Sequence, residues 1–157
     1  MKIYLYILPL FLMASSAFGA EKNPVPRFVS FRPNEVNVRV GPGPNYPVEW
    51  IYLKAGFPME VVAEFDTWRK VRDLDGIEGW VHQSMLSSKR HAIIKGAEAL
   101  MFAKEDSKSP PLVRLQQGVI VDLLRCRGEW CQVRIYDFKG WIQRPLLWGV
   151  YPQEELG

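Results

Sequence analysis

The stretch Trp68-Arg69-Lys70-Val71-Arg72 returns in recognisable form as Trp130-Cys131-Gln132-Val133-Arg134, an interval of 62 positions (130 − 68 = 62). Other residues repeat with it: Gly56 returns as Gly118, and Gly79-Trp80 returns as Gly140-Trp141, one residue short of that interval. A repeat of this length is a small domain and not one unit of a common solenoid, so the sequence predicts two copies of one module. Such a module is smaller than most enzyme folds, and we expect function in surface grooves and at the seam between the copies.

The first residues have the pattern of a secretory signal peptide. A single early charge at Lys2 precedes an apolar run over residues 3–13, and Ala17-Phe18-Gly19 suits a cleavage site directly after it. The apolar run of about 11 residues is shorter than the roughly 20 that a membrane anchor needs, and Pro9 disfavours an internal helix. The sequence predicts a signal peptide over residues 1–19, no membrane span after its removal, and a periplasmic or secreted protein.

Charge and composition narrow the function classes. The chain has 20 Lys and Arg residues, of which Lys2 lies in the signal peptide, against 17 Asp and Glu residues. Because the two signs are nearly balanced and interspersed, the chain has no basic patch for nucleic acid. Pro and Gly interrupt the sequence at short intervals, which favours short strands over long helices.

The two cysteines, Cys126 and Cys131, flank Gly128-Glu129. Gly in the first central position favours a two-residue type II′ hairpin turn. The cysteines then form a non-hydrogen-bonded cross-strand pair, whose side chains are close enough for a disulfide. Export supports this pairing, because such bonds persist in oxidising compartments. A metal site would need further ligands, and a redox or nucleophilic cysteine is the remaining alternative.

The first copy offers a check on this hairpin. The interval of 62 residues places Glu64 and Arg69 at the positions of the two cysteines, on either side of Asp66-Thr67. Opposite charges at a cross-strand position can form an ion pair where the second copy has a covalent bond. We therefore predict that Glu64 and Arg69 are neighbours.

Short alternating runs separated by turns predict about five strands in each copy. In the first copy the expected strands cover residues 36–40, 51–53, 57–65, 68–73 and 79–82, and an irregular Gly- and Pro-rich loop covers residues 41–47. The pattern predicts an all-β protein of two small, sharply bent barrels. The expected boundaries are an extended lead-in over residues 20–30, a first domain over residues 31–90 and a second domain over residues 91–157.

One strand of each copy breaks the alternation. In an alternating strand, Glu60 would share a face with Val62, and Asp122 would share a face with Leu124, whose apolar side chains predict that this face is the core side. We expect a bulge or bend in this strand, because tightly curved barrels need one.

Several of these residues together resemble the bacterial SH3 (SH3b) domain. The resemblance rests on Asn37-Val38-Arg39-Val40-Gly41-Pro42, Gly56, Trp68-Arg69-Lys70-Val71-Arg72, Gly76 and Gly79-Trp80-Val81. It covers the first copy well and the second copy more weakly. The closing run Leu147-Trp148-Gly149-Val150-Tyr151-Pro152 is similar to the end of tandem SH3b proteins exported by Gram-negative bacteria. The resemblance implies a cell-wall peptide or another envelope component as the ligand.

The second copy departs from this pattern at its opening motif. Leu100 and Phe102 are expected at the positions of Val38 and Val40, and the run around them has no Asn, Arg or Gly. The second domain is therefore a degenerate copy, and we expect ligand binding in the first.

No arrangement of residues predicts catalysis. The only histidines, His82 and His91, follow a strand and lie in a basic connector, and we expect both at the surface. With both cysteines bonded, a Cys-His hydrolase has no nucleophile. The prolines of Gly41-Pro42-Gly43-Pro44 remove the N–H donors that a phosphate loop presents. We expect a protein that is not an enzyme and has no metal or cofactor.

The ligand-binding candidates are aromatic and polar residues of the first copy. They are Asn37, Arg39, Tyr46, Trp50, Tyr52, Trp68 and Arg72. Aromatic rings can hold a peptide or a sugar face, and Arg39 can pair with a ligand carboxylate.

These aromatic residues also have structural alternatives. Tyr46 and Tyr52 can pack the loop onto its own barrel. Trp68 and Trp130 can cap a barrel or fill the seam between the copies. Trp80 and its counterpart in the second copy follow Gly in an apolar strand, and we expect them in the core.

The sequence thus predicts a non-catalytic periplasmic module that binds peptidoglycan or a cell-wall peptide through its first domain. The alternative is an adaptor that presents the seam between its barrels to an envelope protein. The sequence leaves the oligomeric state open.

Overall fold

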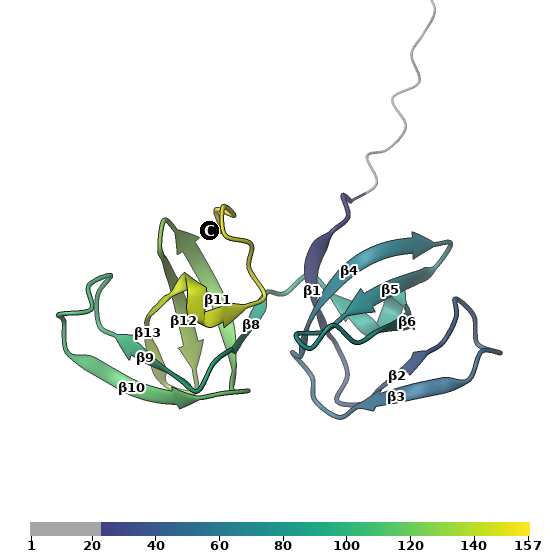
Figure 1. Ribbon diagram of the computed structural model, residues 1–157, viewed down its shortest axis with the longest axis horizontal. Coiled ribbons are helices and arrows are strands. Elements are labelled where there is room, and N and C mark those ends of the chain that lie inside the picture. Colours follow the sequence, from purple (N-terminus) through teal and green to yellow (C-terminus); the bar gives the residue numbers. More distant parts are fainter. Residues whose placement is uncertain (1–22) are drawn as a thin grey trace, which may run out of the picture.

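The computed structural model describes residues 23–157, which form two antiparallel β-sheets (Figure 1). The first sheet contains β1 (Arg27–Phe31), β2 (Val36–Arg39), β3 (Val48–Tyr52), β4 (Pro58–Phe65), β5 (Trp68–Arg72), β6 (Glu78–His82) and β7 (Leu86–Ser87). The second contains β8 (His91–Ile94), β9 (Glu98–Phe102), β10 (Pro111–Gln116), β11 (Ile120–Arg127), β12 (Trp130–Ile135), β13 (Phe138–Gln143) and β14 (Leu147–Trp148). One 3-10 turn precedes the last strand of each sheet: η1 (Gln83–Met85) and η2 (Arg144–Leu146). The predicted signal peptide lies outside the described residues.

The two sheets repeat one topology. The strand order is β3-β2-β6-β5-β4-β1-β7 in the first sheet and β10-β9-β13-β12-β11-β8-β14 in the second. Each strand of the first sheet therefore corresponds to the strand of the second sheet whose number is seven higher, as β1 does to β8. Each sheet bends sharply around its own hydrophobic core, and β1 and β8 lie at the facing sides of the two halves (Figure 1). The prediction of an all-β protein with two tandem small barrels is confirmed. No helix within residues 23–157 has the length and apolar character needed to cross a membrane.

The predicted hairpins are present in both domains. Cys126 and Cys131 are cross-strand partners and form a disulfide. Glu64 and Arg69 occupy the same positions in the first domain, where Arg69 Nε lies 3.1 Å from Glu64 Oε1. At each turn the first central residue has a left-handed φ, +50° at Gly128 and +49° at Asp66. The ion pair in the first domain therefore occupies the position that the disulfide occupies in the equivalent hairpin of the second domain.

The predicted bulge occurs in both copies, but the strand residues that face the core are not the expected ones. The register between β4 and β5 shifts after Val61, and that between β11 and β12 shifts after Leu123. Val61 and Leu123 are buried in the two cores, whereas Val62 is the extra residue of the bulge and is half-buried. The expectation that Val62 marks the core phase was wrong, because the bulge turns the strand over at that residue.

The opening strands also align differently from the expectation. Arg39 of β2 pairs with Trp80, and Phe102 of β9 pairs with Trp141. Phe102 is therefore equivalent to Arg39 and not to Val40. Equivalent residues of these strands are 63 positions apart, one more than in the hairpins, because the turn from β3 to β4 is one residue longer than the turn from β10 to β11.

Segment 27–31, which includes the end of the expected lead-in, is an integral strand of the first barrel. β1 pairs with β4 and with β7, and its residues 28–31 are all buried. Phe31 belongs to the first core, whereas Phe28 faces the second domain. A strand buried on both faces lacks the alternation by which half-buried strands are recognised.

The tryptophans after the strand glycines occupy the outer side of the sheet. Gly79 and Val81 are buried on the core side, so the intervening Trp80 lies on the other face and is half-buried. Trp141 is buried, with 9% of its surface exposed, and the guanidinium of Arg127 lies 5.3 Å from its ring. The expectation of a core position therefore fails for Trp80.

Candidate functional site

Exposed apolar side chains gather on one hairpin of the first domain. Of the 11 large hydrophobic residues that are exposed in the described chain, six lie between positions 40 and 53: Val40, Tyr46, Val48, Trp50, Ile51 and Leu53. We call these six residues the β3 surface. Their exposed fractions run from 40% at Val48 to 73% at Leu53. Large exposed apolar patches on soluble proteins mark interaction sites, so this surface is the first candidate.

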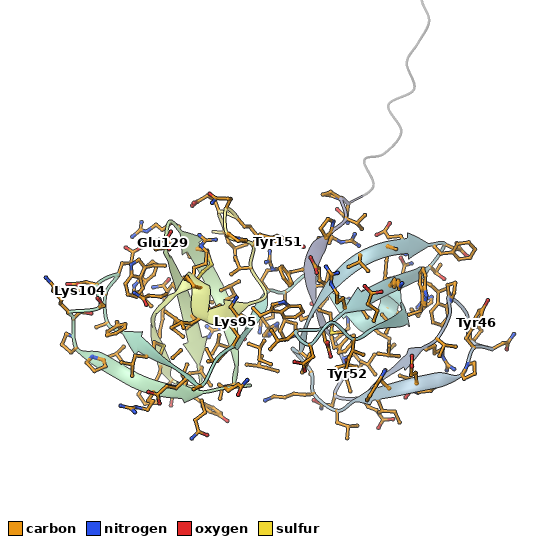
Figure 2. The ribbon with its side chains drawn as sticks, in the orientation of Figure 1. Tyr46, Tyr52, Lys95, Lys104, Glu129 and Tyr151 are labelled. Carbon is orange, nitrogen blue, oxygen red and sulfur yellow. A yellow bond between two sulfur atoms is a disulfide. The ribbon has the colours of Figure 1, made fainter. Side chains whose placement is uncertain are left out.

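The loop next to the β3 surface is held in one conformation. Arg39 Nη1 donates a hydrogen bond to the carbonyl oxygen of Tyr46 at 2.8 Å. The ring of Tyr46 lies so close to Gly41 that a side chain there would collide with it. Arg39 and Tyr46, both predicted to contact a ligand, therefore fasten the loop to its own barrel. Tyr46 remains 47% exposed at the outer end of the first domain, away from the seam (Figure 2).

Tyr52 has a structural role in the first domain. Its hydroxyl donates to Asp73 Oδ2 at 2.8 Å, and its ring packs against Phe31 and Phe57. Burial first, and then the hydrogen bond to Asp73, raise the pKa of Tyr52 above its ordinary value. The phenol therefore stays protonated and keeps donating this hydrogen bond. Tyr52 is a wall of the barrel and not part of an open groove.

The remaining candidates do not form one site. Trp68 is half-buried, and its ring meets that of His82 edge to face with centroids 5.7 Å apart. Arg72, at the other end of β5, donates to Glu60 Oε2 from Nη2 at 2.6 Å and from Nε at 3.1 Å. Asn37 is exposed on β2 beside Ile51, its cross-strand partner. Of the seven predicted residues, Tyr46 and Trp50 belong to the β3 surface, and Asn37 is exposed beside it.

The second domain protects the equivalent edge. β10 carries the same bulge as β3, but it begins at Pro111, and its Arg114 forms an ion pair with Glu98 of β9 at 3.2 Å. Prolines, bulges and charges are common means of blocking an edge strand. Phe102 replaces the loop-fastening Arg39 and meets the ring of Trp130 edge to face at 5.9 Å. The edge strand of the first domain therefore has more exposed apolar side chains than that of the second domain, where Leu112 is the exposed large hydrophobic residue.

Aromatic contacts join the two domains. Phe28 of β1 meets Trp148 of β14 edge to face with centroids 5.0 Å apart, and it lies 4.6 Å from the ring of Tyr151. The guanidinium of Arg90, in the linker, lies 5.8 Å from the same Phe28 ring. Each contact combines residues of different domains or of the linker, so the seam is a packed interface.

A buried carboxylate lies at the centre of this seam. Glu60 is 7% exposed, and its Oε1 accepts a hydrogen bond from the Tyr151 hydroxyl at 2.8 Å while its Oε2 accepts from Arg72. Burial and the hydrogen bond to Glu60 raise the pKa of Tyr151. A buried charge needs such partners, and here they come from both domains. Sequence reasoning missed this role of Glu60, although its polar character on an apolar strand was a signal.

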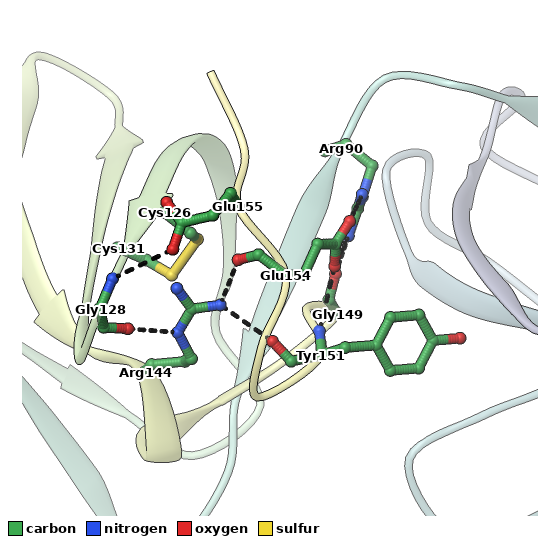
Figure 3. Close-up of a disulfide and its surroundings, with 9 residues drawn as sticks. All are labelled: Arg90, Cys126, Gly128, Cys131, Arg144, Gly149, Tyr151, Glu154 and Glu155. Carbon is green, nitrogen blue, oxygen red and sulfur yellow. Dashed lines mark hydrogen bonds and ion pairs between the residues drawn. A yellow bond between two sulfur atoms is a disulfide. The ribbon is translucent and has the colours of Figure 1, made fainter.

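The C-terminal segment is fastened across the second barrel (Figure 3). Arg144, which is 6% exposed, donates to the carbonyl oxygens of Gly128 at 2.7 Å, Tyr151 at 2.9 Å and Glu154 at 2.6 Å. Glu154 in turn accepts from Arg90 Nη1 at 2.5 Å. These contacts fix the position of Tyr151 relative to the first domain. No motif in the sequence pointed to this arrangement.

A cleft of about 440 Å³ opens at the seam. We call it the seam cleft. Its lining comes from β1 and β4 of the first domain and from the second domain: Phe28, Glu60, Lys95, Glu129, Arg144, Pro145, Leu147, Trp148, Val150, Tyr151, Pro152 and Gln153. Within residues 23–157 no three His, Cys, Asp or Glu side chains are grouped as metal ligands would be.

Comparison with known proteins agrees with this duplicated architecture. The model of the bacterial SH3 domain family matches residues 32–88 and again residues 95–149. The chain belongs to the bacterial SH3 domain family. The two matches fall on the two barrels, so the protein contains tandem bacterial SH3 domains.

Two solved structures are similar to the chain at low identity. The structure of NlpC2 from Trichomonas vaginalis is 11% identical, with 81% of this chain and 49% of that chain covered and a TM-score of 0.35. The structure of NlpC1 from Trichomonas vaginalis is 13% identical, with 90% and 50% covered and a TM-score of 0.34. The chain spans about half the length of these two structures. The comparison with curated proteins found no match.

Proposed function

We propose that this protein is a non-catalytic binding module of the cell envelope, which recognises peptidoglycan through the peptide part of the polymer. The proposal rests on the β3 surface of the first bacterial SH3 domain, where six of the 11 exposed large hydrophobic residues gather. The proposed location is the periplasm or the outside of the cell, and no cofactor takes part.

The geometry of the β3 surface suits an extended ligand. β3 is the edge strand of its sheet, so its outer N–H and C=O groups have no neighbouring strand. An extended peptide can hydrogen-bond to such an edge while its side chains contact the apolar residues on either face. The loop beside it is already fixed by Arg39, so binding requires little ordering of the protein. Trp50, which is 45% exposed in the middle of β3, is the expected anchor.

Sedimentation with purified peptidoglycan tests this proposal. We expect Trp50→Ala to lower the association constant about fivefold or more, as loss of an aromatic anchor does. Phe65→Ala is the matched control, because Phe65 is 61% exposed but lies at the β4–β5 turn. Circular dichroism establishes that both variants are folded. Unchanged sedimentation of Trp50→Ala, or equal losses in the two variants, would contradict binding at the β3 surface.

The adaptor function has one observation in its favour. The seam between the domains is not fully closed, because the seam cleft opens there with aromatic and charged walls. A ligand at this cleft would contact both domains at once.

A further inference from the structure

The seam cleft is held open by a rigid frame. Its volume of about 440 Å³ lies within the range of small-ligand pockets. Arg144 fixes the C-terminal wall through three carbonyl oxygens, and the hydrogen bond from Tyr151 to Glu60 joins that wall to the first domain. Because these contacts are already made, a ligand can enter without reorganising the protein.

The accessible walls of the cleft are flat and apolar. Trp148 and Tyr151 line the cleft and are half-buried, and both rings pack against Phe28. Pro145 and Pro152, both exposed, complete the lining on the second domain. Aromatic and proline rings offer contact area with little conformational entropy to lose, and they favour extended chains with small or apolar side chains.

The charges at the cleft fall into two classes. Glu60 and Arg144 are more than nine-tenths buried and spend their polar atoms on Tyr151, Arg72 and backbone carbonyls. Lys95 and Glu129 are exposed, and neither side chain has a partner among the described residues. One cation and one anion thus remain free to contact a ligand, and they do not pair with each other.

We propose that the seam cleft binds short peptides that carry both a free amino group and a free carboxylate. Lys95 pairs with the carboxylate, Glu129 pairs with the amino group, and the rings of Trp148 and Tyr151 contact the chain between them. This site is separate from the β3 surface and does not depend on the function proposed for it. The site requires both domains, because the residues that line the seam cleft come from the two of them.

A titration with tri-alanine followed by nuclear magnetic resonance of the tryptophan indole N–H groups tests the proposal. We expect the Trp148 signal to shift on addition of the zwitterionic peptide. The same peptide with an acetylated N-terminus and an amidated C-terminus should bind at least about fivefold more weakly, because it loses both ion pairs.

Charge reversals locate the site. Lys95→Glu and Glu129→Lys should each weaken binding of free tri-alanine, and both residues are exposed, so folding is retained. Lys104→Glu is the control, because Lys104 is also exposed but lies at the end of the second domain far from the seam (Figure 2). Equal affinity for the capped peptide overturns the proposal, as does absence of any Trp148 shift. A shift confined to Trp50 also overturns it and would instead support the β3 surface, so the two proposals fail separately.

Discussion

At the scale of single residues, glycines set how closely the strands of each barrel approach. A side chain at Gly140 would place its Cβ 2.6 Å from the carbonyl oxygen of Phe102 and 2.7 Å from Met101 Cγ. Gly79 meets the equivalent strand of the first domain, where Val38 occupies the same space. The repeated Gly-Trp pair in the sequence therefore reflects a close crossing of two strands in each barrel.

We predict that Gly140→Ala lowers the free energy of unfolding by about 2–3 kcal/mol, because the new methyl group meets backbone that cannot move away. Gly96→Ala is the comparison: it has nothing within 4 Å and only a left-handed φ of +80°, so it should cost about 1 kcal/mol. Urea denaturation measures both. Equal costs in the two variants would show that conformation, and not the close crossing, is limiting.

At the scale of elements, the equivalent hairpins of the two domains are held together by different interactions. The disulfide between Cys126 and Cys131 closes a loop with a separation of five residues, and both cysteines are buried in the second core. Glu64, in the first domain, lies 2.8 Å from Arg27 of β1 as well as 3.1 Å from Arg69. The first hairpin is thus linked to a third strand by charge, whereas the second is closed on itself by a bond.

We predict that replacing both cysteines by alanine lowers the free energy of unfolding by about 2 kcal/mol, the value expected for so small a loop. Glu64→Ala should cost about 1.5–3 kcal/mol, because the Glu64 side chain is only 11% exposed and its removal leaves Arg27 and Arg69 without this partner. Thermal unfolding with and without a reducing agent measures the first effect, and only the parent protein should respond to the reductant. A parent protein whose melting temperature ignores reduction would contradict the prediction.

At the scale of the whole molecule, the seam makes the two domains one body. Tyr151 and Glu60 are separated by 91 residues in the chain, and Arg90 and Glu154 by 64. Ser30 Oγ also donates to the carbonyl oxygen of Lys89 in the linker at 2.8 Å. These bonds are polar and directional, so they fix the relative orientation of the domains.

We predict that Tyr151→Phe lowers the free energy of unfolding by about 1.5–3 kcal/mol, because the buried carboxylate of Glu60 loses a donor. Scanning calorimetry should also show two partly separated transitions in place of one. Tyr136→Phe is the control, since Tyr136 is 89% exposed. A Tyr151→Phe profile that overlays the parent would show that the seam does not couple the domains.

The seam also predicts a dependence of stability on pH. Burial lowers the pKa of His91, although the carboxylate of Asp122, 3.2 Å from Nε2, acts in the opposite direction. Lys89 and Arg134 also form ion pairs with the carboxylate of Asp122. Burial acts to raise the pKa of Asp122, but the hydrogen bond from Arg134 and the charge of Lys89 leave it lowered.

Because the folded pKa of His91 is below its unfolded value of about 6.5, the unfolded chain binds more protons between the two values. The contribution of His91 to stability is therefore complete above about pH 6.5 and is lost as the pH falls toward the folded pKa. We predict a lower free energy of unfolding at pH 5 than at pH 7, and His91→Gln should remove most of this difference. His82→Gln should retain it. A parent protein of equal stability at both pH values would contradict the assignment.

Local features of the sequence predicted much of the fold. The hairpin pairs 64–69 and 126–131, the bulged strand and the barrel class all follow from short-range patterns that the duplication repeats. The candidate site was less predictable. Tyr46 and Trp50 are exposed as expected, but Arg39 and Tyr52 hydrogen-bond to partners in their own domain, the carbonyl oxygen of Tyr46 and the carboxylate of Asp73. A residue type shows that a polar group needs a partner, and it does not show whether that partner is a ligand or the protein.

What the chain encodes locally is thus the repeated strand pattern, its turns and its disulfide, because neighbours along a hairpin are set by spacing alone. The seam, its buried Glu60 and the cleft beside it arise only when segments about 60 to 90 residues apart meet, since long-range contacts depend on how two complete barrels pack. Figure 1 shows the two halves, which share a topology and meet where β1 and β8 face each other.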